Sequence, residues 1–274
     1  MHTHPVDHPI APALHLTRCR RIGVLALIPC WLTIVGCQGP GPRHASATSA
    51  EMNGAASFVA GYSVEGRPIT GWTIGNPSNA ILVFGGIHGD ESASTVLVNR
   101  LIESLRTRSA DGVASILIAT ANPDGLVHGT RENARGVDLN RNFPAANWRA
   151  AGKHHGSQPG SEPETQALMS VMQRYRPRLV VSVHCIHGPR ECNNYDGPGR
   201  GLAEFLSGYN GYPTKASIGY ATPGSFGSWV GVDQNIPVLT LELPRQESAR
   251  SRWEENLAAL AALLRGERDS GMPG

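Results

Sequence analysis

The sequence predicts an α/β fold with a mixed, mostly parallel central sheet flanked by helices. Short apolar runs rich in β-branched residues alternate along the chain with segments whose apolar residues recur at helical spacing. The 274 residues include 32 glycines and 20 prolines, which favours a loop-rich α/β protein over a helical bundle. Helices that alternate with buried strands are typical of one sheet covered by helices, so we expect a single large core.

The N-terminal half of this fold begins with a hairpin over residues 57–75, where two apolar stretches flank a Glu-Gly turn. Residues 80–84 are a continuous apolar run that ends in two glycines, which indicates a buried strand. Residues 91–106 follow it and place apolar side chains at helical spacing. A second buried strand covers residues 115–121.

The C-terminal half adds two strands and two helices. Residues 161–164 match a capping box with proline inside the first turn, and they open a helix that runs to about residue 175. Residues 136–160 have no clear periodicity, and loops of that length are usually functional. The remaining elements are two buried strands and a C-terminal helix with one apolar face, at residues 179–183, 237–241 and 253–264.

Residues 1–36 have the pattern of a secretory signal peptide. Three arginines precede residues 22–36, an uncharged and mostly apolar stretch that is shorter than the ~20 residues of a bilayer span. A buried core helix is the alternative, but Pro29 would interrupt it. Residues 34–37 resemble a bacterial lipoprotein signal, which implies that Cys37 is acylated. We therefore expect export to the cell envelope as a membrane-anchored lipoprotein that faces the periplasm.

The exported part divides into a flexible tether over residues 37–55, one domain over residues 56–267, and a tail over residues 268–274. The tether consists of small residues without periodicity or aromatics. Beyond Cys37, the exported chain has two cysteines, Cys185 and Cys192. In an oxidising compartment they are candidates for a disulfide, with two buried free thiols as the alternative.

The charge of the exported part excludes one class of partner. The formal net charge of the whole chain is +2, from 24 basic and 22 acidic side chains. Residues 1–36 hold three arginines and one aspartate, so their removal leaves 21 basic and 21 acidic side chains. A chain without a net positive charge lacks the electrostatic footprint of nucleic-acid binding.

Candidate metal ligands follow two of the buried strands. His88 and Glu91, three residues apart at a strand-to-helix turn, can aim at one point, and an imidazole and a carboxylate are two of the ligands of a His₂Glu zinc site. Alone, this spacing is weak evidence, because a surface His and Glu near a turn is commoner. His184 ends the strand at residues 179–183 and is the candidate third ligand, although a histidine there is also compatible with a plain core residue.

The segment between these sites resembles the zinc carboxypeptidase family, and the resemblance covers nearly all of residues 57–267. It is carried by H-x-x-E at residue 88, R-x-N at 131, D-L-N-R-N-F at 138, S-x-H at 182 and T-L-E-L at 240. The resemblance implies a hydrolase with one zinc ion, bound by His88, Glu91 and His184. Such enzymes remove an amino acid from the carboxyl end of a peptide.

The resemblance also implies a role for each of the remaining motif residues. Glu242 is the implied general base, and Arg131 polarises the carbonyl of the bond that is cleaved. Asp138 holds the second nitrogen of His88, as carboxylates behind zinc-bound histidines commonly do. The substrate-binding residues are Asn140 and Arg141, which bind the terminal carboxylate, and Tyr220, a mobile tyrosine. The fork of donors of an arginine suits a carboxylate.

Two later segments resemble the bacterial murein peptide amidase branch, which cuts the γ-D-glutamyl–diaminopimelate bond of cell-wall peptides. These are residues 194–198 and 223–229. The small side chains at Gly227 and Ser228 leave room for a long polar side chain. We expect three residues to pair with its far, zwitterionic end: Asn193, Asn194 and Asp196.

Other functions remain open at this point. A general metallocarboxypeptidase that removes C-terminal amino acids from peptides would keep every catalytic residue. A zinc amino-acid deacylase would share the zinc ligands. A non-catalytic murein-binding lipoprotein is disfavoured, because no ligand or base is missing. A serine hydrolase is disfavoured too, because the Gly-x-Ser segment at residue 61 lacks the closing glycine of a nucleophile elbow.

Overall fold

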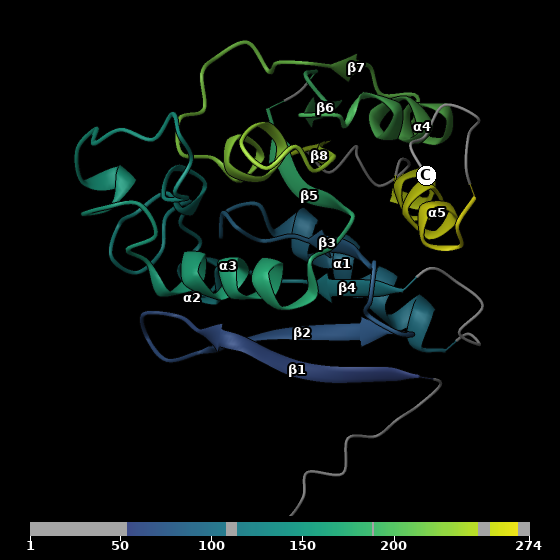
Figure 1. The fold of residues 1–274 in the computed structure, drawn as a ribbon, viewed down its shortest axis with the longest axis horizontal. Coiled ribbons are helices and arrows are strands. Elements are labelled where there is room, and N and C mark those ends of the chain that lie inside the picture. The colour runs from purple at the N-terminus through teal and green to yellow at the C-terminus, as the bar shows by residue number, and fades with distance from the viewer. Residues whose placement is uncertain (1–53, 108–113, 188, 246–252, 268–274) are drawn as a thin grey trace, which may run out of the picture. The chain divides into compact units, whose positions relative to one another are not determined.

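An eight-stranded mixed sheet runs through the part of the chain that the structure, a computed structural model, describes: residues 54–107, 114–187, 189–245 and 253–267 (Figure 1). The predicted signal peptide, the tether up to residue 53 and the tail lie outside these ranges. The strands are β1 (Ala55–Tyr62), β2 (Pro68–Ile74), β3 (Ile81–Phe84), β4 (Ser115–Ile118), β5 (Leu179–Ile186), β6 (Cys192–Asp196), β7 (Thr214–Lys215) and β8 (Val238–Pro244).

The order of the strands is β1-β2-β4-β3-β5-β8-β6-β7. Strands β4, β3, β5 and β8 are parallel neighbours in the middle of the sheet, while β1 and β2 form an antiparallel hairpin that pairs through β2 with β4. On the other side β6 runs antiparallel to β8 and parallel to β7. This confirms the predicted mixed sheet. The carboxyl ends of its parallel strands meet at one edge, where α/β proteins usually bind ligands.

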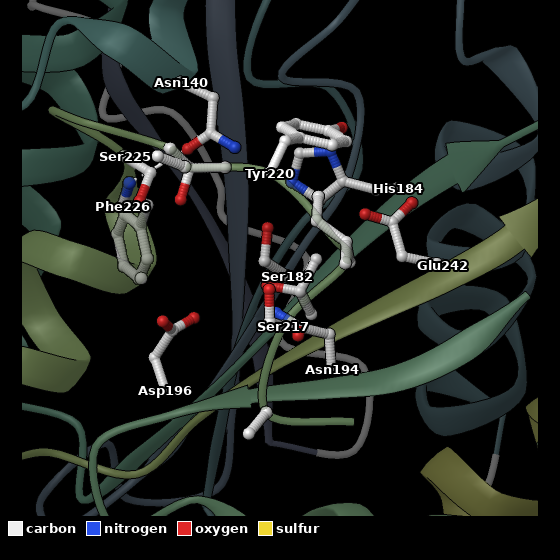
Figure 2. A pocket seen from close by; sticks show the side chains of 16 residues that line it. Asn140, Ser182, His184, Asn194, Asp196, Ser217, Tyr220, Ser225, Phe226 and Glu242 are labelled. Carbon is white, nitrogen blue, oxygen red and sulfur yellow. Dashed lines mark hydrogen bonds between the residues drawn. The ribbon is translucent and has the colours of Figure 1, made fainter. Parts of the chain in front are cut away.

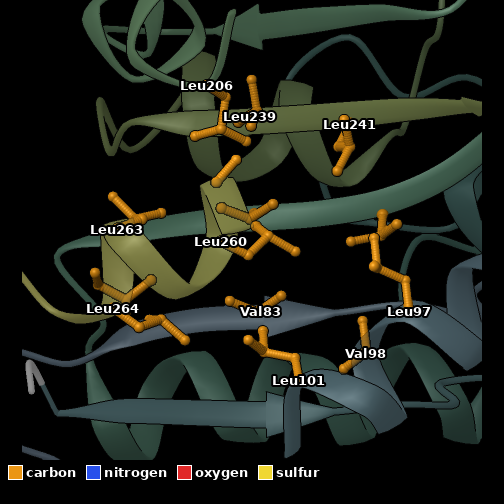
Figure 3. Close-up of a cluster of buried hydrophobic side chains, with 14 of the residues drawn as sticks. Val83, Leu97, Val98, Leu101, Leu206, Leu239, Leu241, Leu260, Leu263 and Leu264 are labelled. Atoms are coloured by element: carbon orange, nitrogen blue, oxygen red, sulfur yellow. The ribbon is translucent and has the colours of Figure 1, made fainter. Parts of the chain in front are cut away.

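Helices cover both faces of the sheet. One face packs against α1 (Ser92–Arg106), α4 (Arg200–Asn210) and α5 (Trp253–Leu264), whose leucines meet those of β8 (Figure 3). The other face packs against α3 (Pro163–Tyr175) and the π-helical segment Gly227–Val232. Side chains of β5 and β8 alternate between these two cores, as the pleat of a strand requires. Among the described residues no helix is long and apolar enough to cross a membrane.

The start of α3 differs from the predicted capping box. Glu162 is the N-cap and its side chain caps no backbone group of the helix. The hydroxyl of Ser161 donates to Glu162 instead, and Glu164 accepts from the backbone N–H of Val64 and from Asn133 Nδ2, both at 3.0 Å. Contacts with distant parts of the chain therefore replace the local pattern that the sequence suggested.

Several elements were not predicted from the sequence. Helix α2 (Pro123–His128) has six residues, and β6 carries Asn, Tyr and Asp rather than an apolar run. Helix α4 contains two glycines and is flanked by two more, which lowers its helix propensity. The long loop at residues 136–160 holds two short 3₁₀ turns, Leu139–Arg141 and Lys153–His155, and otherwise remains irregular, as expected.

The two cysteines of the domain are free, buried thiols, which is the second of the two alternatives that the sequence left open. Cys185 lies on β5 and Cys192 on β6, and β8 runs between these strands. Two strand spacings amount to about 9.6 Å, whereas a disulfide needs Cα atoms within roughly 7 Å. The register also turns the side chains to opposite faces of the sheet, because Cys192 is level with Glu242 and Cys185 with Leu243.

Candidate metal centre and substrate pocket

Three buried side chains converge at the carboxyl edge of the parallel strands. His88 and Glu91 come from the turn between β3 and α1, and His184 comes from β5. The distances are 2.9 Å from His88 Nδ1 to Glu91 Oε1, 3.2 Å from His184 Nδ1 to Glu91 Oε2, and 3.3 Å between the two Nδ1 atoms. Ligands that lie about 2.0–2.1 Å from a tetrahedral zinc ion are about 3.3 Å apart. The donor set and its spacing therefore fit a zinc ion.

Two glycines shape the turn that presents His88 and Glu91. Gly86 follows β3 with φ +61, a conformation that favours glycine. At Gly89 a Cβ atom would lie 1.8 Å from the backbone of Gly125 in α2, so a larger residue does not fit. The chain then turns tightly, with the N–H of Glu91 donating to the carbonyl of His88 at 3.2 Å. This turn places both side chains on the same side of the strand edge.

Asp138 orients the first histidine. Its Oδ1 lies 3.1 Å from His88 Nε2, and its Oδ2 accepts from Arg131 Nε at 3.0 Å. A proton on Nε2 that faces Asp138 leaves the lone pair of Nδ1 toward Glu91 and His184, as metal binding requires. Burial opposes ionisation of Asp138, but His88 and Arg131 outweigh burial and hold the pKa of its carboxyl well below the usual range.

The centre is electrostatically suited to a cation. Burial disfavours the charged form of His88, yet Glu91 and Asp138 outweigh burial and raise the pKa of His88 to about 9. Burial likewise opposes the charge on Glu91, and the two histidines hold the pKa of its carboxyl well below the ordinary value. Two buried carboxylates therefore stabilise positive charge at the point where the ring nitrogens meet.

Glu242 stands beside this cluster as a buried carboxylate with no hydrogen-bond partner among the described residues. It is 6% exposed and level with His184 across the β5–β8 pair. Burial raises the pKa of Glu242, so the group is more basic than an ordinary glutamate. Arg245, three residues further along the chain, does not pair with Glu242 but contacts Asp90 Oδ2 at 2.9 Å and Glu91 Oε1 at 3.3 Å.

The predicted substrate-binding residues surround the same centre. Arg131 Nη1 lies 3.3 Å from Glu91 Oε1, at the border of the cluster. Asn140 accepts from the backbone N–H of Phe226 through Oδ1 at 2.9 Å, and its amide nitrogen points toward the pocket (Figure 2). Arg141 Nη1 donates to the carbonyl of Asn140 at 2.7 Å, and no carboxylate among the described residues pairs with it. Tyr220, 52% exposed, lines the pocket.

A cavity of about 140 Å³ opens next to His184 and Glu242. Its lining is mostly polar and comes from β5, β6, β8 and the segment 216–227 (Figure 2). Of the residues expected to pair with a substrate side chain, Asn194 and Asp196 line it, and so does Gly227. Other polar residues of the lining are Ser182, Ser217, Thr222, Ser225 and Thr240.

Two expectations about the pocket were wrong. Asn193 faces away from it, because the residues of β6 alternate, and its Nδ2 donates to Asn210 Oδ1 at 3.0 Å. Ser228 does not line the cavity, and its hydroxyl is engaged with Ser225 and Asn147. Sequence reasoning also missed Ser182 and Thr240 as lining residues. The available signal was strand alternation, since each stands two residues before a functional side chain.

The comparisons with known proteins agree with this geometry. A family model described as zinc carboxypeptidase matches residues 47–188. Murein peptide amidase A of Escherichia coli (strain K12) is 41% identical over 203 residues, which cover 67% of this chain and 78% of that protein. Murein peptide amidase A of Vibrio campbellii is 35% identical over 226 residues, which cover 76% of this chain and 87% of that protein.

Solved structures show the same similarity. The murein-tripeptide amidase MpaA from Escherichia coli O157 superposes with a TM-score of 0.66 at 37% identity, over 76% of this chain and 91% of that chain. The carboxypeptidase A from Helicoverpa armigera has a TM-score of 0.65 at 20% identity, over 79% of this chain and 70% of that chain, and shows the shared fold. With its cluster of two histidines and a glutamate at the expected strand ends, this chain belongs to the zinc carboxypeptidase family.

Proposed function

We propose that the protein is a murein peptide amidase, a zinc hydrolase that cleaves the γ-D-glutamyl–diaminopimelate amide bond of cell-wall peptides. The observation that carries the proposal is the complete set of reactive groups around one polar pocket: His88, Glu91 and His184 converge, and Glu242 stands unpaired beside them. The murein peptide amidases A of two bacteria, which match over two thirds of this chain or more, support the choice of bond.

Each residue of the centre has a chemical task. A zinc ion held by His88, Glu91 and His184 would act as a Lewis acid and lower the pKa of water. Glu242, whose pKa burial raises, takes the proton of the attacking water on its carboxylate and returns it to the leaving amine nitrogen. Arg131, which borders Glu91, donates to the oxygen of the amide carbonyl as negative charge develops there.

A second group of residues holds the end of the substrate. Arg141, which has no carboxylate partner among the described residues, and the amide nitrogen of Asn140 bind the free α-carboxylate of the released residue. Tyr220 lies half exposed at the pocket and closes over the substrate. This clamp makes the enzyme cut the last amide bond rather than internal bonds.

A general metallocarboxypeptidase is the second candidate, because the same centre would remove amino acids from ordinary peptides. The polar lining of the pocket favours a polar side chain over an apolar one. A zinc amino-acid deacylase would use the same ligands but needs no specific peptide on the acyl side.

The test compares substrates of the three candidates on one protein. Incubation with L-Ala-γ-D-Glu-diaminopimelate should release diaminopimelate, detected by mass, faster than hippuryl-amino acids or N-acetyl-amino acids are cleaved. Glu242→Gln should lower this activity by about 10²–10⁴-fold because it removes proton transfer, while bound zinc and substrate affinity persist. Preferential cleavage of hippuryl substrates would favour the general carboxypeptidase, and near-normal turnover by Glu242→Gln would contradict the role of the base.

We also propose that the protein is exported and anchored in the membrane by acyl chains on Cys37. This residue lies outside the described part of the chain, so the lipoprotein-like segment at residues 34–37 is the support. Anchoring would place the enzyme beside murein. The full-length protein should sediment with membranes, and Cys37→Ser should release it, because acyl chains supply the attachment. A Cys37→Ser protein that still sediments with membranes would contradict the lipid anchor.

A further inference from the structure

Helix α1 begins without a side-chain cap, because its N-cap residue serves the metal centre. That residue is Glu91, and its side chain caps no backbone N–H of the helix but lies 2.9 Å from His88 Nδ1. An N-cap side chain normally accepts from N–H groups of the first helical turn and so fixes the chain there. The segment 86–91, which carries His88 and Glu91, therefore depends on other contacts to keep these two side chains in place.

The hydroxyl of Ser94, in the first turn of α1, joins the two ends of this segment. Its Oγ donates to the carbonyl of Glu91 at 2.6 Å and accepts from the backbone N–H of Gly86 at 2.9 Å. Ser94 is 0% exposed, so both bonds lie in the interior, where a missing partner is costly. One buried side chain thus closes the segment into a loop.

Asn122, the N-cap of α2, holds the same segment from the opposite side. Its backbone N–H donates to the carbonyl of Gly86 at 2.8 Å, and its Nδ2 donates to the carbonyl of Ile87, the residue before His88, at 3.3 Å. Its Oδ1 accepts from the N–H of Gly125 at 2.9 Å, so the side chain also caps α2. Asn122 is 0% exposed as well.

Close packing leaves the segment little room on the side of α2. A Cβ atom at Gly89 would lie 1.8 Å from the carbonyl carbon of Gly125, so the two backbones already touch. Ser94 and Asn122 prevent movement away from this contact. The backbone between Gly86 and Glu91 is therefore fixed by α1 and α2 together.

We propose that Ser94 and Asn122 are positioning residues of the metal centre, which hold the backbone of His88 and Glu91 so that both side chains meet His184 at distances suited to zinc. Neither belongs to the three candidate ligands, and neither lines the substrate pocket. The inference rests on the zinc centre of the proposed function and not on the identity of the substrate, so zinc binding tests it directly.

A positioning role differs from a merely structural one in what it does to the folded protein. A segment released from Ser94 or Asn122 samples several conformations, and zinc binding must then order it, which lowers the affinity. A merely structural contact lowers the stability of the fold but leaves the geometry of the ligands in the folded state unchanged. Zinc affinity and ligand geometry therefore separate the two roles.

The first test compares two serines of α1. Competition with a chelator of known affinity gives the zinc Kd of the folded, metal-free protein. Ser94→Ala should raise this Kd at least about tenfold, as changes around the ligands of metal sites commonly do. Ser104→Ala is the matched control, because Ser104 Oγ also donates to a carbonyl three residues back, that of Leu101 at 3.0 Å, but far from the segment. It should keep the Kd within about twofold.

The second test uses Asn122→Asp, which keeps the acceptor for Gly125 but places an acceptor against the carbonyl of Ile87. It should also raise the zinc Kd at least about tenfold. The added negative charge would by itself favour a cation, so charge does not explain a weaker affinity. The control is Ser63→Ala, which removes a buried hydroxyl that donates to Asp124 of α2 at 2.6 Å. It loosens α2 without touching the segment and should leave the Kd unchanged.

Two further measurements complete the comparison. The visible absorption of protein loaded with Co²⁺ in place of zinc reports ligand geometry, and it should change in Ser94→Ala and Asn122→Asp but not in the controls. The Tm of the metal-free proteins measures stability. Should one variant fail to fold, the other decides by the same criteria.

The outcomes separate this inference from the proposed function. If the wild-type protein binds no zinc, the metal centre itself is refuted, and the proposed function with it. If it binds zinc and both variants keep its affinity and Co²⁺ spectrum, the function stands and the positioning role is refuted. The role is also refuted if the control variants weaken zinc binding as much at an equal loss of Tm.

Discussion

The metal centre and the far end of the pocket lie on the same face of the same strands, yet they differ in how their polar groups are satisfied. Around the centre, His88 is bonded on both ring nitrogens and Glu91 on both oxygens, by residues of several elements. In the pocket, Asn194 Oδ1 and the carboxylate of Asp196 have no hydrogen-bond partner among the described residues. The protein itself pairs the polar groups of the first region, whereas it leaves these acceptors of the second region unpaired.

The largest effect should follow from a substitution that disrupts the metal centre. His184→Ala removes one of three ligand atoms, so zinc binding and hydrolysis should both fall below detection, because the charge that activates water is lost. Metal content by mass spectrometry and product release measure this. His154→Ala, an exposed histidine, is the matched control and should keep one zinc per chain. Full zinc content in His184→Ala would exclude the proposed centre.

A smaller effect is expected at the proposed clamp for the terminal carboxylate. Amidation of that carboxylate should lower kcat/KM at least tenfold, and Arg141→Lys should be nearly as harmful although it keeps the charge, because the planar fork is lost. In Arg141→Ala, amidation should matter much less, since both changes remove one interaction. Equal cleavage of free and amidated substrates by the wild-type enzyme would refute the clamp.

Removal of the metal should make the stability of the centre depend on pH. In the metal-free protein the carboxylates around His88 raise its pKa to about 9. A raised pKa stabilises the fold fully below the unfolded value of about 6.5, and this stabilisation is lost as the pH rises through about 9. The Tm of the chelated protein should therefore fall between pH 6.5 and 9.5 relative to that of the zinc-loaded protein. If the Tm of the chelated protein and that of the zinc-loaded protein changed with pH in the same way, this prediction would be contradicted.

The smallest effect concerns the thiols of Cys185 and Cys192, which are buried on opposite faces of the sheet. Because β8 separates them, a reductant should leave the Tm unchanged within about 1 °C, whereas loss of a disulfide commonly costs 2–5 kcal/mol. Thiol titration of the unfolded Cys37→Ser protein that retains residues 1–36 should find four free thiols, namely those of Cys185 and Cys192 together with Cys19 and Cys30. A reductant-dependent Tm in the purified protein would show that the two cysteines pair after all.

The same contrast explains what the sequence could predict. His88, Glu91 and Glu242 belong to short motifs at strand ends, and the resemblance of these motifs as a set to the zinc carboxypeptidase family implied their roles. The depth of the pocket depends instead on the pairing of β6 with β8, which no local pattern encodes, and β6 itself is too polar to be recognised as a strand. For this reason Asn193 was expected at the pocket although it faces away from it, whereas Asn194 and Asp196 do line the pocket.

The interior of the sheet was predictable because continuous apolar runs suffice to identify buried strands, and β3, β4, β5 and β8 were all found within a few residues. The side-chain contacts at the start of α3 were harder. Glu164 accepts from Asn133 Nδ2 and from the backbone N–H of Val64, which are 31 and 100 residues away in the sequence. Contacts with such distant groups cannot be read from a window of a few residues.

The register of β6 against β8 sets fixed levels on the face of the sheet that carries the site. Cys192 is level with Glu242, Asn194 with Thr240 and Asp196 with Val238, so successive levels lie about 7 Å apart. Because backbone pairing fixes these levels, a substitution at one of them changes the wall of the pocket there without moving Glu242. During divergence, or in engineering, the shape of the pocket can therefore change while the metal centre stays in place.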